Sequence, residues 1–384
     1  MLARVCLRSR LFRWVSPAAL VLLCGHGRPS PAQAQPAQTA PARPVAISPA
    51  QAEVQPNLSL DRDPVLSPDA DDNLPIDAQG ISTAGRSKDL QKDQKGVFTL
   101  QENVNEVLLN CTVLDQKGRL VLDLKQGDFR LWEDGVPQKV GSFQHQDLPV
   151  SMGILVDNSG SMRDKRGAVT QAALDLVKAS NPEDAAFVVN FSDRAYLDQN
   201  FTSNIAALER GLARFDSRST TALYDAVVAS AKELATHAKQ PKQVVLIITD
   251  GADNASRVTL EQAIQRVQLL GGPVVYSIGM LFGDNKEDAE TAQKALEALS
   301  AETGGVAYFP QSLQDVDEIA KEVAQDIRNQ YTIGYHSTKP PNLGGYRTVR
   351  VEATAPKHGK LVVRTRKGYY PGAAANNPTV AETK

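Results

Sequence analysis

Five oxygen-bearing side chains are the residues of this sequence whose types and spacing could do chemistry together. Asp157, Ser159 and Ser161 alternate along one short segment, and alternate residues of an extended segment point the same way. Thr221 and Asp250 would add a hydroxyl and a second carboxylate. Hard divalent cations such as Mg²⁺ prefer oxygen ligands in near-octahedral geometry. The five side chains therefore form a candidate metal site, provided that the fold brings them together.

The elements around these residues could bring them to one edge of a sheet. Asp157 directly follows the apolar run 150–156, and Asp250 follows the apolar run 244–248 after a single threonine. Thr221 stands just before a segment with helical apolar spacing. Ligands of open α/β sheets bind in the crevice outside the carboxyl ends of the strands. Two strand ends and one helix start should therefore aim their oxygens at one crevice.

Residues 149–335 alternate between strand and helix patterns. The nearly continuous apolar runs are typical of a parallel sheet covered on both faces; they are 150–156, 185–191, 244–248 and 274–278. The segments 169–177, 205–215, 223–234, 260–267 and 316–327 have the apolar spacing of amphipathic helices. Because the link 192–194 is too short for a crossover helix, 195–199 should be an antiparallel edge strand. This pattern predicts the α/β class with a doubly wound, mostly parallel sheet.

Strand-like patterns on both sides of this region predict a second folding unit. Residues 97–148 contain alternating runs and a hairpin signal at 133–135, followed by a returning strand over 136–143. The strand pattern resumes at 331–335, the end of the α/β region. It continues at 346–354 and 360–366 in a C-terminal β segment, 336–370. Two strands cannot bury a face alone. We therefore expect one β-sandwich-like domain, built from N- and C-terminal strands, that flanks the inserted α/β domain. The basic residues of its last strands, among them Arg347 and Arg366, should line a solvated face.

The two ends of the chain predict export and little regular structure. Residues 1–34 combine a basic start, an apolar run at 14–24 and a small-residue cleavage site ending at Ala34, which together indicate a signal peptide. Lipidation at Cys24 is a weaker alternative. Residues 35–96 have the composition of a disordered spacer, and 371–384 form a short disordered tail. We expect a secreted, periplasmic or extracellular protein with no transmembrane segment in the mature chain.

Charge and cysteine content exclude several classes of function. The signal peptide carries five arginines and no acids, so its removal moves the formal charge from -2 to -7. An acidic chain of this kind argues against nucleic acid as a partner. Cys111 would be the only cysteine left, which excludes an intrachain disulfide and a cysteine-based zinc site. Cys111 lies in an apolar run and should be a buried thiol.

The pattern Asp-x-Ser-x-Ser after a strand, a downstream Thr, and Thr-Asp-Gly after another strand resembles the metal ion-dependent adhesion site of von Willebrand factor type A domains. The resemblance implies that Asp157, Ser159, Ser161, Thr221 and Asp250 hold Mg²⁺ or Mn²⁺. Relatives usually have Gly-Gly before the threonine; here Ser219 and Thr220 leave a choice between Thr220 and Thr221, and the helix start favours Thr221. Motifs between 97 and 371 also resemble a bacterial family of secreted VWFA-related proteins, known chiefly from acidobacteria.

The resemblance implies binding through the metal. Two carboxylates and three neutral hydroxyls do not saturate a divalent ion, which stays electrophilic toward an outside oxygen. We therefore expect a metal-dependent protein-binding module, an adhesin or an envelope scaffold, whose protein ligand supplies a carboxylate. The alternatives are a structural envelope protein with a stabilising metal and a metal-dependent hydrolase. We expect no enzyme activity, because Ser159 stands where an Asp-x-Asp phosphatase has its general acid.

Overall fold

The computed structural model describes Leu58 and residues 106–179, 181–214, 218–282 and 285–371. The predicted signal peptide at 1–34 and the predicted beginning of order at 97 lie outside the described residues, as do nearly all of the spacer and the tail. Leu58 is the exception within the spacer, because it is buried and belongs to a hydrophobic cluster of the α/β domain. No helix among the described residues is long and apolar enough to cross a membrane.

A six-stranded, mostly parallel sheet forms the α/β domain, in the order β10-β9-β8-β5-β6-β7. All neighbours pair in parallel except β7, which pairs antiparallel with β6, so the predicted edge strand is confirmed. The short link at 192–194 permits only this direction. The strands are β5 (Val150–Asp157), β6 (Ala185–Phe191), β7 (Ala195–Thr202), β8 (Lys242–Thr249), β9 (Val274–Gly279) and β10 (Ala307–Tyr308).

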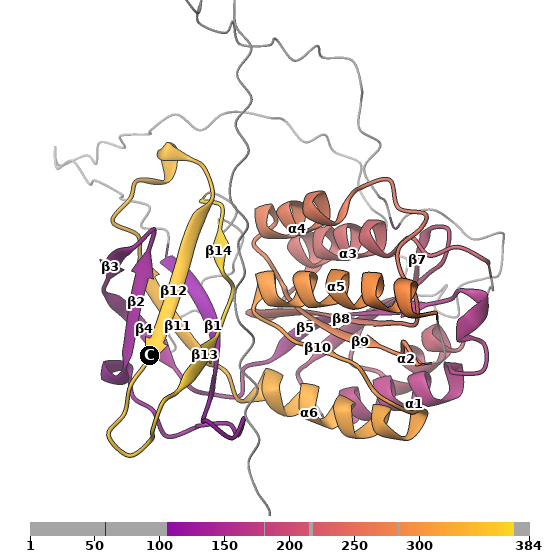
Figure 1. Cartoon of the computed structure of the whole chain (residues 1–384), viewed down its shortest axis with the longest axis horizontal. Helices are drawn as coiled ribbons and strands as arrows, with labels where there is room; N and C mark the ends of the chain where they lie inside the picture. Colours follow the sequence, from indigo (N-terminus) through magenta and orange to yellow (C-terminus); the bar gives the residue numbers. More distant parts are fainter. Residues whose placement is uncertain (1–57, 59–105, 180, 215–217, 283–284, 372–384) are drawn as a thin grey trace, which may run out of the picture. The chain divides into compact units, whose positions relative to one another are not determined.

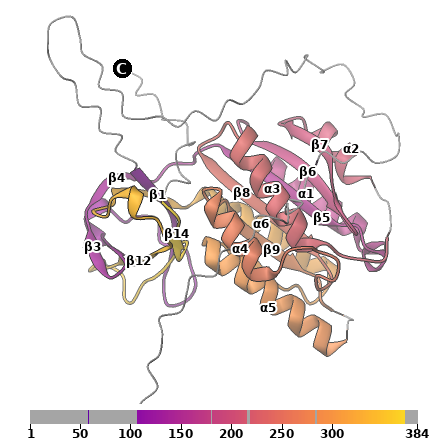
Figure 2. The same cartoon turned by 90° about the horizontal axis from the view of Figure 1, so that it is seen from above.

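Six helices cover the two faces of this sheet. Figure 1 shows α3, α4 and α5 on one face and α1, α2 and α6 on the other, and Figure 2 looks onto the first of these faces. They are α1 (Arg166–Lys178), α2 (Ile205–Leu212), α3 (Leu223–His237), α4 (Leu260–Leu269), α5 (Lys286–Thr303) and α6 (Val316–Arg328). Helices on both faces confirm the predicted doubly wound α/β class.

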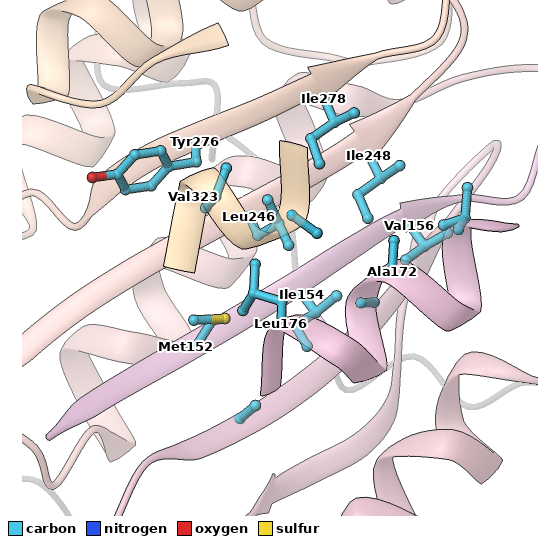
Figure 3. Close-up of a cluster of buried hydrophobic side chains, with 14 of the residues drawn as sticks. Met152, Ile154, Val156, Ala172, Leu176, Leu246, Ile248, Tyr276, Ile278 and Val323 are labelled. Carbon is cyan, nitrogen blue, oxygen red and sulfur yellow. The ribbon is translucent and has the colours of Figure 1, made fainter. Parts of the chain in front are cut away.

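Side chains of successive strand residues enter opposite faces of the sheet. Ile154 on β5 packs with Leu176 of α1 and Val323 of α6 in one cluster, as Figure 3 shows. Leu155, the next residue, belongs to the cluster that contains Ala226 of α3 and Leu296 of α5. Because both faces are buried, the strands need apolar residues at nearly every position, and this is the pattern that the sequence shows.

Two four-stranded sheets form the second unit, in the orders β13-β1-β11-β4 and β14-β12-β2-β3. Each sheet contains strands from before and after the α/β domain, and the two sheets share one hydrophobic core. The predicted β-sandwich of N- and C-terminal strands is therefore confirmed. Its strands are β1 (Glu106–Leu114), β2 (Phe129–Glu133), β3 (Val136–Gln138), β4 (Val140–Gln144), β11 (Tyr331–His336), β12 (Arg347–Ala353), β13 (Val362–Arg364) and β14 (Gly368–Tyr369).

Single-turn 3₁₀ helices complete the described secondary structure, at Gln126–Asp128, Gly160–Met162, Leu313–Asp315 and Pro341–Leu343. The strand β11 pairs with β1 and β4, so the sandwich resumes at Tyr331. The sequence placed the end of the α/β domain a few residues later, at 335. The expected strand over 136–143 is two strands. Its first half pairs with β2 across a tight turn in which Asp134 and Gly135 have positive φ, and its second half joins the other sheet.

The helix α5 is not among the five segments with the apolar spacing of amphipathic helices. Its inward residues include Ala292 and Ala295, and alanine produces a weak apolar signal. Asn285 caps the helix by accepting a hydrogen bond from Asp288 N, and Gly304 ends it with a φ of 91°. The segment that follows β9 therefore becomes helical at Lys286.

The expectation of a solvated basic face is wrong for two arginines. Arg347 is 1% exposed and donates hydrogen bonds to the carbonyl oxygens of Lys339 and Pro340. Arg366 donates to the carbonyl oxygens of Leu108 and Gly271, which joins the sandwich to the α/β domain. These contacts with backbone carbonyls join residues of different segments, so they form only once the chain is folded.

Candidate metal site

Asp157 and Asp250 stand at the same edge of the sheet because their strands are neighbours. Asp157 is the last residue of β5, and Asp250 directly follows β8, which pairs in parallel with β5. Both residues are buried, with exposed fractions of 0% and 2%. The fold therefore places two carboxylates at the carboxyl ends of adjacent central strands, as the sequence predicted.

Asp157 is held between its own loop and the end of β8. Its Oδ1 accepts a hydrogen bond from the backbone N–H of Ser159 at 2.7 Å, and its Oδ2 accepts one from the Thr249 hydroxyl at 2.6 Å. Burial raises the pKa of Asp157 to about 6; the hydrogen bonds from Thr249 and Ser159 oppose this shift, and the charge of Asp250 adds to it. Sequence reasoning missed Thr249, although it directly precedes Asp250.

Ser159, Ser161 and Asp250 form a triangle of oxygens. The two serine Oγ atoms are 3.1 Å apart, the Ser161 hydroxyl donates to Asp250 Oδ1 at 2.9 Å, and the Ser159 hydroxyl lies 3.5 Å from the same oxygen. Adjacent oxygens around an octahedral Mg²⁺ with bonds near 2.1 Å would be about 3.0 Å apart. Two of the three edges of the triangle are close to this length, the third is longer at 3.5 Å, and the hard oxygen donors fit this cation.

Thr221 reaches the same region through the loop that follows β8. It is 4% exposed; its N–H donates to Asn254 Oδ1 at 2.8 Å, and its carbonyl accepts from the Asn254 N–H at 3.0 Å. Among the hydrogen bonds of the described residues, none joins the Thr221 side chain to the other four candidate residues. The structure therefore brings four of the candidates together directly and connects the Thr221 backbone to Asn254, in the loop that follows Asp250.

The same loop caps the start of α3. Asp253 accepts a hydrogen bond from the Tyr224 N–H, and Ser256 accepts one from the Asp225 N–H, both at 3.0 Å. In return, Asp225 accepts hydrogen bonds from the N–H of Arg257. These contacts satisfy helix N–H groups that have no partner within the helix. They explain why acids and small polar residues follow Asp250, and they fix the beginning of α3 beside the site.

Arg166 joins the first site loop to the segment after α2. Its guanidinium donates to the carbonyl oxygens of Leu212 at 2.5 Å and Arg214 at 3.0 Å, and it lies 3.5 Å from the Asp157 carbonyl. It also donates to Asn190 Oδ1 on β6. Five donors in a rigid planar group suit this task. Sequence reasoning did not identify Arg166, since a single arginine near a helix start has no distinctive spacing.

Lys165 is the second positive group that sequence reasoning missed. Its ammonium donates to Asp250 Oδ2 at 2.6 Å, lies 3.4 Å from the Met280 carbonyl and is 5.3 Å from the centre of the Phe282 ring. Lys165 is the N-cap of α1, where the helix dipole disfavours a cation. A lysine in that position, four residues after Ser161, was a signal that could have indicated an acidic partner.

Among the described residues, no group of three or more His, Cys, Asp or Glu side chains could hold a metal ion. The cluster at the sheet edge differs from such a site because hydroxyls supply much of its oxygen. Cys111 is fully buried, as expected, and burial raises the pKa of its thiol to about 12. The mixed carboxylate and hydroxyl cluster is therefore the metal-site candidate of the described part of the chain.

Comparison with known proteins identifies the α/β domain. Residues 152–252 match the family model of the von Willebrand factor type A domain, and this range contains all five candidate residues. A comparison with curated protein sequences gives no match.

Solved structures of low identity align with the chain. They include a von Willebrand factor type A protein from Catenulispora acidiphila, with 16% identity, 64% of this chain and 72% of that chain covered, and a TM-score of 0.40. The vWF domain of the type V pili tip protein Mfa5 from Porphyromonas gingivalis has 12% identity, coverages of 47% and 95%, and a TM-score of 0.40. On the strength of the family model and the doubly wound sheet, the α/β domain of this chain is a von Willebrand factor type A domain.

Proposed function

We propose that this protein is a binding module in which Asp157, Ser159, Ser161, Thr221 and Asp250 hold a divalent cation, Mg²⁺ or Mn²⁺, that accepts a carboxylate from a partner protein. The observation that carries the proposal is the triangle of Ser159, Ser161 and Asp250 oxygens, with spacings of 2.9 to 3.5 Å at the carboxyl edge of the sheet. Its dimensions suit an octahedral cation.

The chemistry of the donors favours an open coordination position. Two carboxylates balance a doubly charged ion, and the hydroxyls add no further charge, so a bound cation would supply a Lewis-acidic position for an outside oxygen. Gly160 and Ser161 are exposed, whereas Asp157 and Asp250 are buried. A partner would therefore approach over the Gly160–Ser161 rim, while the acids hold the ion from below.

We propose binding rather than catalysis because of the residue two positions after Asp157. A phosphatase of the Asp-x-Asp type uses a carboxyl group there as its general acid. This chain has Ser159, whose hydroxyl lies against Ser161 and Asp250 instead. An assay of the purified protein for Mg²⁺-dependent phosphatase activity tests this point, and we expect no turnover above that of the Asp157→Ala variant.

Titration with Mn²⁺, followed by electron paramagnetic resonance, tests the metal site. We expect one site per chain, with affinity lowered at least tenfold by Asp157→Ala and by Asp250→Ala. Asp175→Ala, which removes an acid on the outer surface of α1, is the matched control and should leave the affinity unchanged. Equal Mn²⁺ binding by the wild type and both site variants would refute the proposed site.

Capture experiments test the role of the metal in partner binding. Because residues 1–34 predict export, cell-envelope fractions are the source of partners. We expect a protein that is retained in Mg²⁺, released by EDTA and not retained by Asp157→Ala. If Mg²⁺ raises the melting temperature but every retained protein binds equally in EDTA, the metal is structural and the proposed role in recognition is wrong.

A further inference from the structure

We propose that Lys165 is a built-in competitor of the divalent cation: its ammonium neutralises Asp250 in the metal-free protein and lowers the affinity of the site for metal. This inference rests on the proposed function, because it concerns the same five-residue site. It assigns a regulatory task to a residue outside the motif that first indicated the site.

The contact between Lys165 and Asp250 is short and shielded from water. Nζ lies 2.6 Å from Asp250 Oδ2, and the side chains are 14% and 0% exposed. The other oxygen of Asp250 accepts the hydrogen bond from Ser161. One carboxylate therefore joins the oxygen triangle on one side and the ammonium on the other. A charge-assisted hydrogen bond of this length is among the stronger polar contacts in proteins.

A cation held by the oxygen triangle and the ammonium would be close neighbours of like charge. Among the described residues, the Lys165 Nζ contacts Asp250 at the end of β8, the Met280 carbonyl and the Phe282 ring. No other ion pair of Lys165 occurs among the described residues. Since repulsion is strong where water is excluded, metal binding must weaken or break the Lys165–Asp250 contact.

The side chain of Lys165 is able to leave. Its four-carbon stem has many rotamers, and the residue stands at the N-terminal end of α1, where the helix dipole repels its charge. Asp250 is the acid that holds it there. The backbone of Lys165 is fixed independently, since its N–H donates to Met162 and its carbonyl accepts from Val169. Loss of the side-chain contact should therefore leave α1 in place.

The test compares Mn²⁺ affinity and melting temperature for the mature chain and three variants. Lys165→Met should bind Mn²⁺ at least tenfold more tightly, because the competing charge is gone. In EDTA it should melt below the wild type, since Asp250 then lacks its counter-ion. Lys165→Arg keeps the charge and should not gain affinity. Lys178→Met removes an exposed lysine at the far end of α1 and should match the wild type in both measurements.

The outcomes separate this inference from the proposed function. Unchanged or weaker Mn²⁺ binding by Lys165→Met, with the affinity still lowered at least tenfold by Asp250→Ala, would overturn the competitor role and leave the proposed metal site unrefuted. A gain of affinity in Lys165→Arg equal to that in Lys165→Met would also overturn it, because charge would not be the cause. Absence of Mn²⁺ binding in the wild type and in Lys165→Met would refute both.

Discussion

Lys242, at the start of β8, shows how one buried charge sets a pH dependence. It is 2% exposed and donates a hydrogen bond of 2.6 Å to the carbonyl of Ile327, in the last turn of α6. Burial lowers the pKa of Lys242 from 10.5 to about 8, although Asp147, Asp326 and Asp184 oppose the shift. Between these two pH values the unfolded chain binds more protons than the folded one, so stability rises with pH.

We expect the free energy of unfolding to gain about 2 kcal/mol from Lys242 between pH 7.5 and 9.5. Lys242→Met should lose this rise, because methionine does not titrate. Urea denaturation at several pH values measures the slope, and Lys178→Met, which alters an exposed lysine, should keep the wild-type slope. Equal slopes for wild type and Lys242→Met would show that the ammonium is not desolvated.

Glu133 is a buried charged residue in the sandwich, as Lys242 is in the α/β domain. Its carboxylate accepts hydrogen bonds from the hydroxyls of Tyr335 and Tyr369, both at 2.8 Å, and of Ser337 at 2.6 Å. Arg347 lies 3.4 Å away, and the two charged side chains are each 1% exposed. Such a pair is sensitive to loss of one member, since the other is left as an unpaired buried charge.

We expect Glu133→Ala to lower the free energy of unfolding by about 3 to 5 kcal/mol. Glu352→Ala breaks the exposed Arg350–Glu352 pair on the neighbouring strand and should cost less than about 1 kcal/mol. Chemical denaturation of both variants gives the comparison. Similar losses in the two variants would contradict the view that burial decides the strength of these pairs.

At the scale of elements, the loop after β8 connects the candidate metal site to α3. Asp253 accepts a hydrogen bond from the Tyr224 N–H and one from the Ser256 hydroxyl, and the next residue, Asn254, holds the backbone of Thr221. The start of α3 and the position of Thr221 therefore depend on the same loop. Stability and metal binding should be coupled at this point.

Asp253→Ala should destabilise the protein by about 1 kcal/mol, the usual effect of a lost helix cap. It should also weaken Mn²⁺ binding several-fold, because it loosens the loop in which the next residue, Asn254, holds Thr221. The matched control is Thr259→Ala. Thr259 is the N-cap of α4, and its side chain accepts a hydrogen bond from Gln262 N. We expect Thr259→Ala to lose a similar amount of stability with unchanged Mn²⁺ affinity. If Asp253→Ala binds Mn²⁺ as tightly as the wild type, the loop does not support metal binding.

At the scale of the whole molecule, the type A domain is inserted into the sandwich between two adjacent strands. The chain leaves from β4 and returns in β11, and these strands pair with Gln144 opposite Thr332. Entry and exit of the inserted domain are therefore close together, as is common for insertions that fold as units. The sandwich, by contrast, needs segments from both sides of the inserted domain, since β1 pairs with β11 and β13.

A fragment of residues 149–330 should accordingly fold alone. It keeps all six strands of the central sheet and loses the contact of Arg364 with Asp326. We expect cooperative unfolding, a melting temperature below that of the full chain, and the Mn²⁺ affinity of the full chain. A fragment without a cooperative transition in calorimetry would show that the sandwich is required for the inserted domain to fold.

Local patterns in the sequence determined many of the secondary-structure elements and the order of the candidate site residues. The apolar runs specified the parallel strands, the Asp134–Gly135 turn specified a hairpin, and the order of Asp157, Ser159, Ser161 and Asp250 indicated a common site. Each of these signals acts over a few residues. The alanine-rich α5 was not among the expected helical segments, because its apolar periodicity is weak.

Contacts between residues distant in the sequence were decided only by the tertiary structure. These include the burial of Arg347 against Glu133, the division of 136–143 between two sheets, and the ammonium of Lys165 on Asp250. A charged residue has the same local pattern whether it meets water or a buried acid. Its environment depends on which elements pack around it, and that packing is a property of the whole fold.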